Sequence, residues 1–115
     1  MEQDPRLELP AGRYDLVASR GAEYEVQRSQ LEIESGGVSE LEVSLVRSVD
    51  TTGWMSAEPH VHAQWSPDSR DSNEAKALGM AAENIELPVS TDHEAVGDFN
   101  PAITSLGLGA WMRGV

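Results

Sequence analysis

The sequence predicts an α+β protein in two parts, a partial antiparallel β-sandwich followed by strand–helix units with parallel strands. Residues 1–50 alternate apolar and polar side chains between glycine-bearing turns, which is typical of antiparallel strands with one face in water. From residue 51 onward, short apolar segments alternate with capped helical segments. At 115 residues the chain has room for one small domain or for parts of two.

Three strands are expected in the first part. Residues 13–19 and 24–34 have strand composition with period-two alternation, and Gly36-Gly37 then forms a turn. Residues 38–46 alternate again and complete an antiparallel meander. Three strands alone leave the edges of a sheet open. We therefore expect the last part of a larger sandwich, with self-association through the open sheet edges.

The second part is expected to begin a parallel sheet. Its elements, in chain order, are a strand at 54–62, a turn at 66–69, a helix at 74–82, a strand at 85–90, a helix at 100–106 and a strand-like segment at 109–115. Ser72 is a suitable helix cap, Pro101 suits a first helical position, and Gly107 a helix end. Trp54, Trp65 and Trp111 are expected to pack in the core or at a hinge.

Composition excludes several classes of function. Eight basic and twenty acidic residues give a net charge of −12, which disfavours nucleic acid and anionic membranes as partners. Without cysteine the chain has neither a disulfide nor a thiol nucleophile. No apolar run is long enough for a transmembrane segment, and the first residues do not form a signal peptide. The compartment stays open.

All three histidines lie in two short motifs. His60 and His62 share one face of an extended strand, with Cβ atoms about 6–7 Å apart. His93 follows the next strand, and the carboxyl ends of neighbouring parallel strands open onto one crevice. Asp68 and Asp92 add carboxylates, a donor set that suits zinc, manganese or iron better than calcium. Ordinary polar residues at strand ends and turns would also account for this pattern.

Two motifs resemble those of the polymerase-and-histidinol-phosphatase (PHP) family of metal-dependent hydrolases. Residues 53–69 read Gly-Trp-x-Ser-x-x-x-His-Val-His-x-x-x-Ser-Pro-Asp-Ser and are most similar to the CehA/McbA branch of the family. Ser90-Thr91-Asp92-His93 resembles the second motif, and residues 10–50 are similar to the β-domain that precedes the catalytic domain in that branch. The resemblance covers nearly the whole chain.

The resemblance implies a fold and a division of the chain. Residues 1–50 would be the C-terminal part of a β-sandwich-like domain. Residues 51–115 would be the N-terminal part of a PHP-type metallohydrolase domain, the first βα units of an incomplete (β/α)7 barrel. An extracytoplasmic parent protein is compatible with this branch.

The resemblance also implies a site. His60, His62, Asp68 and His93 match metal ligands. Asp92 would orient a ligand imidazole, and Glu58 would support the ligands from the position where the family usually has aspartate. A metal-activated hydroxide would attack a small-molecule ester or phosphoester. Because the family draws further ligands from later strands, this chain is expected to be incomplete and not catalytic alone.

Two other interpretations remain open. The chain can be a non-catalytic β-sandwich binding or interaction module whose histidines are structural, or the product of a truncated gene. Metal content and its dependence on His60 distinguish the module from the hydrolase.

Overall fold

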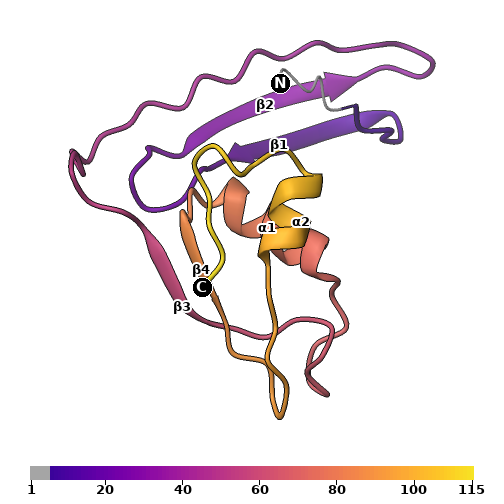
Figure 1. The fold of residues 1–115 in the computed structure, drawn as a ribbon. Coiled ribbons are helices and arrows are strands. Elements are labelled where there is room, and N and C mark those ends of the chain that lie inside the picture. The colour runs from indigo at the N-terminus through magenta and orange to yellow at the C-terminus, as the bar shows by residue number, and fades with distance from the viewer. Residues whose placement is uncertain (1–5) are drawn as a thin grey trace.

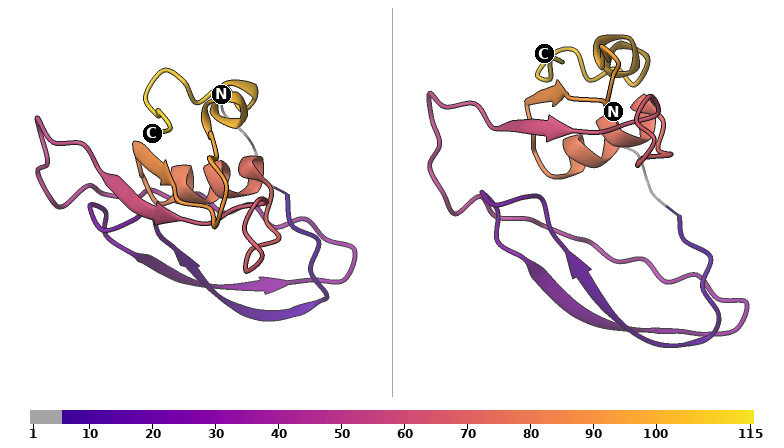
Figure 2. Two further views of the ribbon diagram at one scale, coloured as in Figure 1. Left: turned by 60° about the horizontal axis from the view of Figure 1, so that its bottom comes forward. Right: turned by 90° about the horizontal axis from the view of Figure 1, so that it is seen from below.

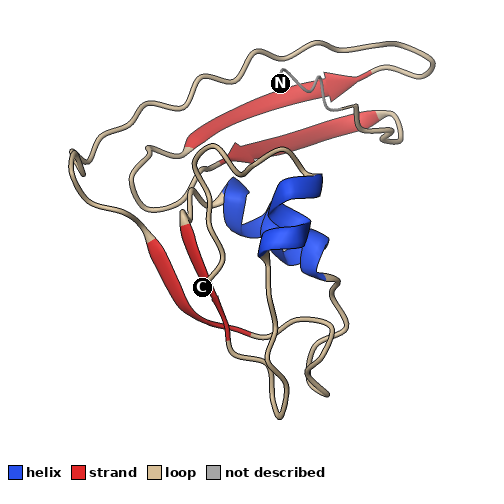
Figure 3. Ribbon diagram, viewed as in Figure 1, coloured by secondary structure: helices blue, strands red, loops and turns tan. Residues whose placement is uncertain are grey.

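The computed structural model describes residues 6–115, a small mixed α/β protein with two small sheets and two helices (Figures 1 and 3). The elements are β1 (Gly12–Ala18), β2 (Gln27–Ile33), β3 (Ala57–Val61), α1 (Asn73–Ala82), β4 (Leu87–Ser90) and α2 (Asn100–Ser105). The predicted mixture of strands and helices is confirmed. Across residues 6–115, neither helix has the length and apolarity that a bilayer crossing requires.

β1 and β2 form the first sheet, an antiparallel pair that lies apart from the helices (Figure 2). Tyr14 faces Leu31 and Leu16 faces Ser29 across the pair. Side chains alternate between half-buried and exposed along both strands, so one face is wet, as predicted. No side chain of either strand is fully buried, and the hairpin therefore contributes nothing to the core.

The expected third strand at residues 38–46 is not formed. This segment follows β2 as an extended loop (Figure 1) and contacts it mainly through a side chain, since the backbone N–H of Ser44 donates to Gln27 Oε1 at 3.0 Å. Leu41 and Val43 remain 42% and 40% exposed. Alternation alone does not fix strand pairing when no core buries the apolar face.

The predicted second strand is also shorter than expected. It begins at Gln27 rather than at Tyr24. Tyr24 makes only an isolated antiparallel bridge with Arg47, where the chain returns from the long loop. The whole three-stranded meander is thus reduced to one hairpin with a partly attached loop.

β3 and β4 pair in parallel, which confirms the predicted start of a parallel sheet. Their register is irregular between Glu58 and Val61. The α1 helix connects the two strands and begins as predicted, because the Ser72 hydroxyl accepts the Ala75 N–H at 3.1 Å. The core lies between this sheet and the two helices; its buried apolar residues are Val61, Ala63, Ala77, Met80, Ala81, Phe99, Ala102, Ile103 and Met112.

Residues 109–115, expected to be strand-like, form a loop that bonds to the free edge of β4. Val115 N–H donates to Pro88 O at 3.0 Å, and Ser90 N–H donates to Val115 O at 3.1 Å, the spacing of a parallel ladder. Arg113 N–H donates to Glu86 O at 2.9 Å. Pro88 has no N–H to return, so one rung of the ladder is missing.

The tryptophans differ from the expectation that all three are packed. Trp54 is 81% exposed and Trp65 is 60% exposed, so neither belongs to the core. Trp111 is half-buried and packs against the core cluster.

A joint of four residues, Arg20, Gly21, Glu23 and Asn84, connects the hairpin to the α/β part. The Asn84 amide oxygen accepts from the Arg20 guanidinium at 3.3 Å, and its nitrogen donates to Glu23 Oε2 at 3.2 Å. Gly21 has a φ of 67°, and a Cβ atom there would lie 2.1 Å from the Glu83 carbonyl oxygen. Only glycine permits this close approach of the two backbones.

We expect Gly21→Ala to separate the two parts. Gly36 is a matched control, because its φ is 72° but nothing lies within 4 Å of its Cβ position. Backbone strain alone should cost about 1 kcal/mol in Gly36→Ala, whereas strain plus overlap should cost about 2–4 kcal/mol in Gly21→Ala. Urea unfolding measures both, and NMR should show the Asn84 side-chain amide shifting only in Gly21→Ala. Equal losses in the two variants would contradict the joint.

Candidate metal centre

The structure brings two histidines and one carboxylate together at the carboxyl ends of the parallel strands. His62 follows β3 and His93 follows β4. Asp68 lies between them, with its Oδ2 3.0 Å from His62 Nδ1 and 3.3 Å from His93 Nε2. One donor atom from each of these three residues lies within 4.8 Å of the other two. The predicted convergence of the two motifs is present in the described chain.

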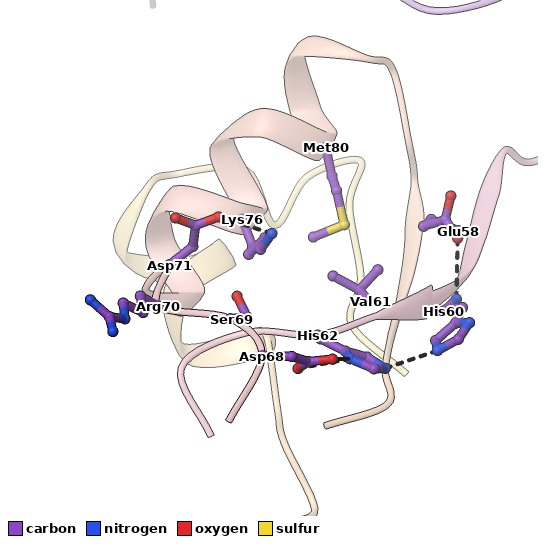
Figure 4. Close-up of a pocket in the computed structure, with 10 residues that line it drawn as sticks. All are labelled: Glu58, His60, Val61, His62, Asp68, Ser69, Arg70, Asp71, Lys76 and Met80. Atoms are coloured by element: carbon purple, nitrogen blue, oxygen red, sulfur yellow. Dashed lines mark hydrogen bonds and ion pairs between the residues drawn. The ribbon is translucent and has the colours of Figure 1, made fainter. Parts of the chain in front are cut away.

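His60 joins this group through His62. The two Nε2 atoms are 2.8 Å apart, so the rings of this His-x-His pair converge as the strand geometry predicts (Figure 4). Two imidazole nitrogens that bind one metal at about 2.1 Å each stand about 3.0–3.4 Å apart, so the pair needs only a small opening to chelate. His60 is exposed to solvent and His62 is half-buried.

Asp68 selects the tautomer of His62. An ionised carboxylate can only accept hydrogen bonds, so in the neutral imidazole the contact places the proton of His62 on Nδ1 and directs the Nε2 lone pair towards His60. The hydrogen bond from His62 holds the pKa of Asp68 below its ordinary value, and the carboxylate is ionised at neutral pH. In this arrangement Asp68 orients the His62 imidazole. A carboxylate commonly has this role, accepting the N–H of the ring nitrogen that does not bind the metal.

Asp92 does not contact an imidazole through any hydrogen bond found among residues 6–115. Its Oδ1 accepts the Ala63 N–H at 2.7 Å and its Oδ2 accepts the Ser90 hydroxyl at 3.1 Å. Burial raises the pKa of Asp92, but hydrogen bonds from Ala63, Ser66 and Ser90 outweigh burial and hold it below its ordinary value. Asp92 therefore ties the backbone after the first motif to the second motif.

Glu58, the other residue expected near the ligands, bonds to backbone as well. Its Oε1 accepts the His60 N–H at 3.2 Å, and the side chain is half-buried (Figure 4). It restrains the main chain of the His-x-His pair.

Two further residues that sequence reasoning missed support the same loops. The buried hydroxyl oxygen of Ser66 accepts the His93 N–H at 2.9 Å, although Ser66 was expected only to form a turn. A Cβ atom at Gly97 would lie 2.0 Å from Ser90 Oγ and 2.7 Å from Asp92 Oδ2. No sequence pattern marked Gly97, because the reason for glycine there is a tertiary contact.

The histidine pair borders a pocket of about 530 Å³ between β3 and α1 (Figure 4). Arg70 and Lys76 contribute positive charge to its lining, and Lys76 pairs with Asp71 at 2.9 Å. Both cations were missed, since isolated basic residues carry no spacing signal. Because Glu58, Asp68 and Asp71 also line the pocket, it combines imidazole donors with side chains of both charges.

Comparison with protein-family models, curated proteins and solved structures finds no match to this chain.

Gly97→Ala should destabilise the loop that carries His93. The new methyl group overlaps Ser90 and Asp92, and overpacking of this kind costs about 1–3 kcal/mol. Gly79→Ala is the control, because its Cβ position is open and alanine in a helix should stabilise by about 0.5–1 kcal/mol. Urea unfolding and the NMR shifts of His93 report the effect. A neutral Gly97→Ala would contradict the described contact.

Asp92→Asn should destabilise the metal-free protein in a pH-dependent way. Hydrogen bonds to a charged group contribute about 1.5–3 kcal/mol, so this is the expected loss near pH 7. The folded-state pKa is lowered, so the contribution is present above the unfolded value of about 3.9 and is lost as pH falls through the folded value. Wild type and variant should therefore converge below about pH 4, measured by urea unfolding in EDTA with Asp15→Asn as an exposed control. A difference that stays constant with pH would contradict this role.

Proposed function

We propose that this chain carries the first part of a metal-dependent hydrolase that is similar to the PHP family, in its CehA/McbA-like branch. On this proposal residues 51–115 begin a (β/α)7-type barrel, and residues 1–50 are the end of a β-sandwich-like domain. The substrate class is a small-molecule ester or phosphoester. The observation that carries the proposal is the approach of His93 Nε2 and His62 Nδ1 to the same carboxylate oxygen of Asp68, at 3.3 and 3.0 Å.

The donor set fits a divalent transition metal. Imidazole nitrogens with carboxylate oxygens suit zinc, manganese or iron. His60 and His62 would bind through their facing Nε2 atoms, His93 would add a third nitrogen, and Asp68 would either bind or orient His62. A metal bound here supplies Lewis-acid activation of water and positive charge opposite the leaving oxygen.

The chain's own residues would hold the substrate and the donors. Arg70 and Lys76 line the pocket beside the histidines together with three carboxylates, so an anionic substrate group would rely mainly on the charge of a bound metal. Asp92 and Ser66 hold the two histidine-bearing loops in register through backbone hydrogen bonds. These contacts fix the backbone that carries the histidines before a metal arrives, which reduces the cost of binding.

Metal binding without turnover is the expected behaviour of this chain by itself. Three imidazoles and one or two carboxylates leave much of a multinuclear site unfilled, and the pocket is open to solvent on the histidine side, since His60, Asp68 and His93 are exposed. Water exclusion and a second charge near the scissile bond are both needed for efficient hydrolysis.

The metal proposal is tested by stoichiometry and affinity. We expect the purified chain to bind Zn²⁺ or Mn²⁺ in isothermal titration, with His62→Ala at least tenfold weaker, because His62 contacts two of the other three donor residues, His60 and Asp68. Asp68→Asn should lose about 10–100-fold through the lost orientation of His62. Glu42→Gln, which removes the same charge from the exposed loop, should bind as wild type. Elemental analysis and a phosphodiester assay complete the measurement.

A specific outcome would favour the alternative, a non-catalytic β-sandwich binding module with structural histidines. The alternative is supported by the solvent-exposed face of the β1–β2 hairpin, since neither strand has a fully buried side chain. It predicts that the purified chain binds no stoichiometric metal and that His60→Ala leaves the metal content unchanged. That result would end the hydrolase proposal.

A further inference from the structure

A second pocket, of about 480 Å³, lies at the joint between the hairpin and the α/β part. Three of the six aromatic residues of the chain line it: Tyr24, Trp54 and Trp111. Trp54 precedes β3, whereas the histidine pair lies at the carboxyl end of this strand, so the joint pocket is separate from the candidate metal centre. Small-molecule sites of this size commonly lie between two parts of a protein.

A hydrogen-bonded turn presents Trp54 at this pocket. Trp54 N–H donates to Thr51 O at 2.9 Å, and Gly53 has a φ of 84°, as the third residue of a type II turn requires. Asp50 Oδ1 accepts from the Thr52 N–H at 3.0 Å and from its hydroxyl at 2.6 Å. The backbone of the turn is thus held in place while the indole stays 81% exposed. An exposed indole that lines a pocket offers an apolar face to a ligand.

The polar wall of the joint pocket is also fixed by internal bonds. The Arg47 guanidinium donates to Glu23 Oε2 at 2.6 Å and to the Thr51 hydroxyl, and Arg20 donates to Asn84. Arg20 additionally lies over the Tyr24 ring, 5.5 Å from its centroid. Donors and acceptors are therefore held ready beside the aromatic rings, so that a ligand would order few side chains on binding.

The joint pocket has no excess of positive charge. Arg20 and Arg47 contribute two positive charges, and Glu86 of the lining with Glu23 and Asp50 at its edge contributes three negative charges. Such a pocket in a protein of net charge −12 disfavours an anion. The two indoles can pack against an apolar face of a ligand ring, and the polar side chains around them can bond to its hydroxyl groups. This combination suits a neutral ligand rich in hydroxyl groups.

From this combination we propose that the joint pocket binds a neutral carbohydrate. The apolar face of a pyranose ring stacks on Trp54, and its hydroxyl groups exchange hydrogen bonds with the arginine and glutamate side chains. Binding at this site does not depend on the proposed metal centre.

The proposal is tested with the purified full chain in EDTA, on an array of neutral oligosaccharides followed by isothermal titration of the bound sugars. Trp54→Ala should weaken binding about tenfold or more, which corresponds to about 1.4 kcal/mol. Trp54→Phe should lose less. Trp65→Ala is the matched control, because Trp65 is also exposed but does not line the joint pocket, and it should bind as wild type.

Circular dichroism checks that each variant folds. We expect all of them to fold, because both indoles are exposed and neither packs in the core. The proposal is overturned if no neutral glycan binds, if only charged glycans bind, or if Trp54→Ala and Trp65→Ala lose affinity equally. Because metal is absent throughout, these outcomes are independent of the hydrolase proposal.

Discussion

The buried carboxylate of Asp92 is the contact on which the histidine cluster depends. It accepts the Ala63 N–H at 2.7 Å and the Ser90 hydroxyl at 3.1 Å, so one side chain ties the end of β3 to the end of β4. The strand ends are joined directly as well, because the Thr91 N–H donates to Val61 O at 2.9 Å, although the register of the pair is irregular. A charged hydrogen bond in a buried setting is directional, and it sets the spacing of His62 and His93 more tightly than apolar packing would.

Stability is distributed unevenly over the protein. Among residues 6–115, every buried apolar residue lies in the α/β part, whereas the hairpin has a half-buried inner face and no core of its own. The hairpin therefore stays in place through polar contacts of Asn84 and through the close approach of Gly21 to Glu83. Isolated hairpins are marginal in water, so these few contacts matter more than their number indicates.

Local signals predicted much of the fold. Ser72, Pro101 and Gly107 mark helix ends through backbone chemistry that acts within a few residues, and both helices formed where these residues placed them. The alternation of apolar and polar residues at 38–46 wrongly predicted a strand. Such a pattern identifies an apolar face but not what covers that face. The His-x-His spacing predicted convergence correctly, since strand geometry is local too.

Tertiary contacts were beyond such reasoning. The roles of Gly97 and Ser66 depend on loops that are distant in sequence, and the exposure of Trp54 depends on how two parts meet.

β3 has different requirements at its two ends. Trp54 precedes it and the His-x-His pair closes it, so a single inserted or deleted residue would turn one end to the opposite side of the sheet. If both ends serve the proposed sites, β3 should tolerate no change in length. The long exposed loop after β2 is not restricted in this way, so we expect it to tolerate insertions and deletions that β3 does not.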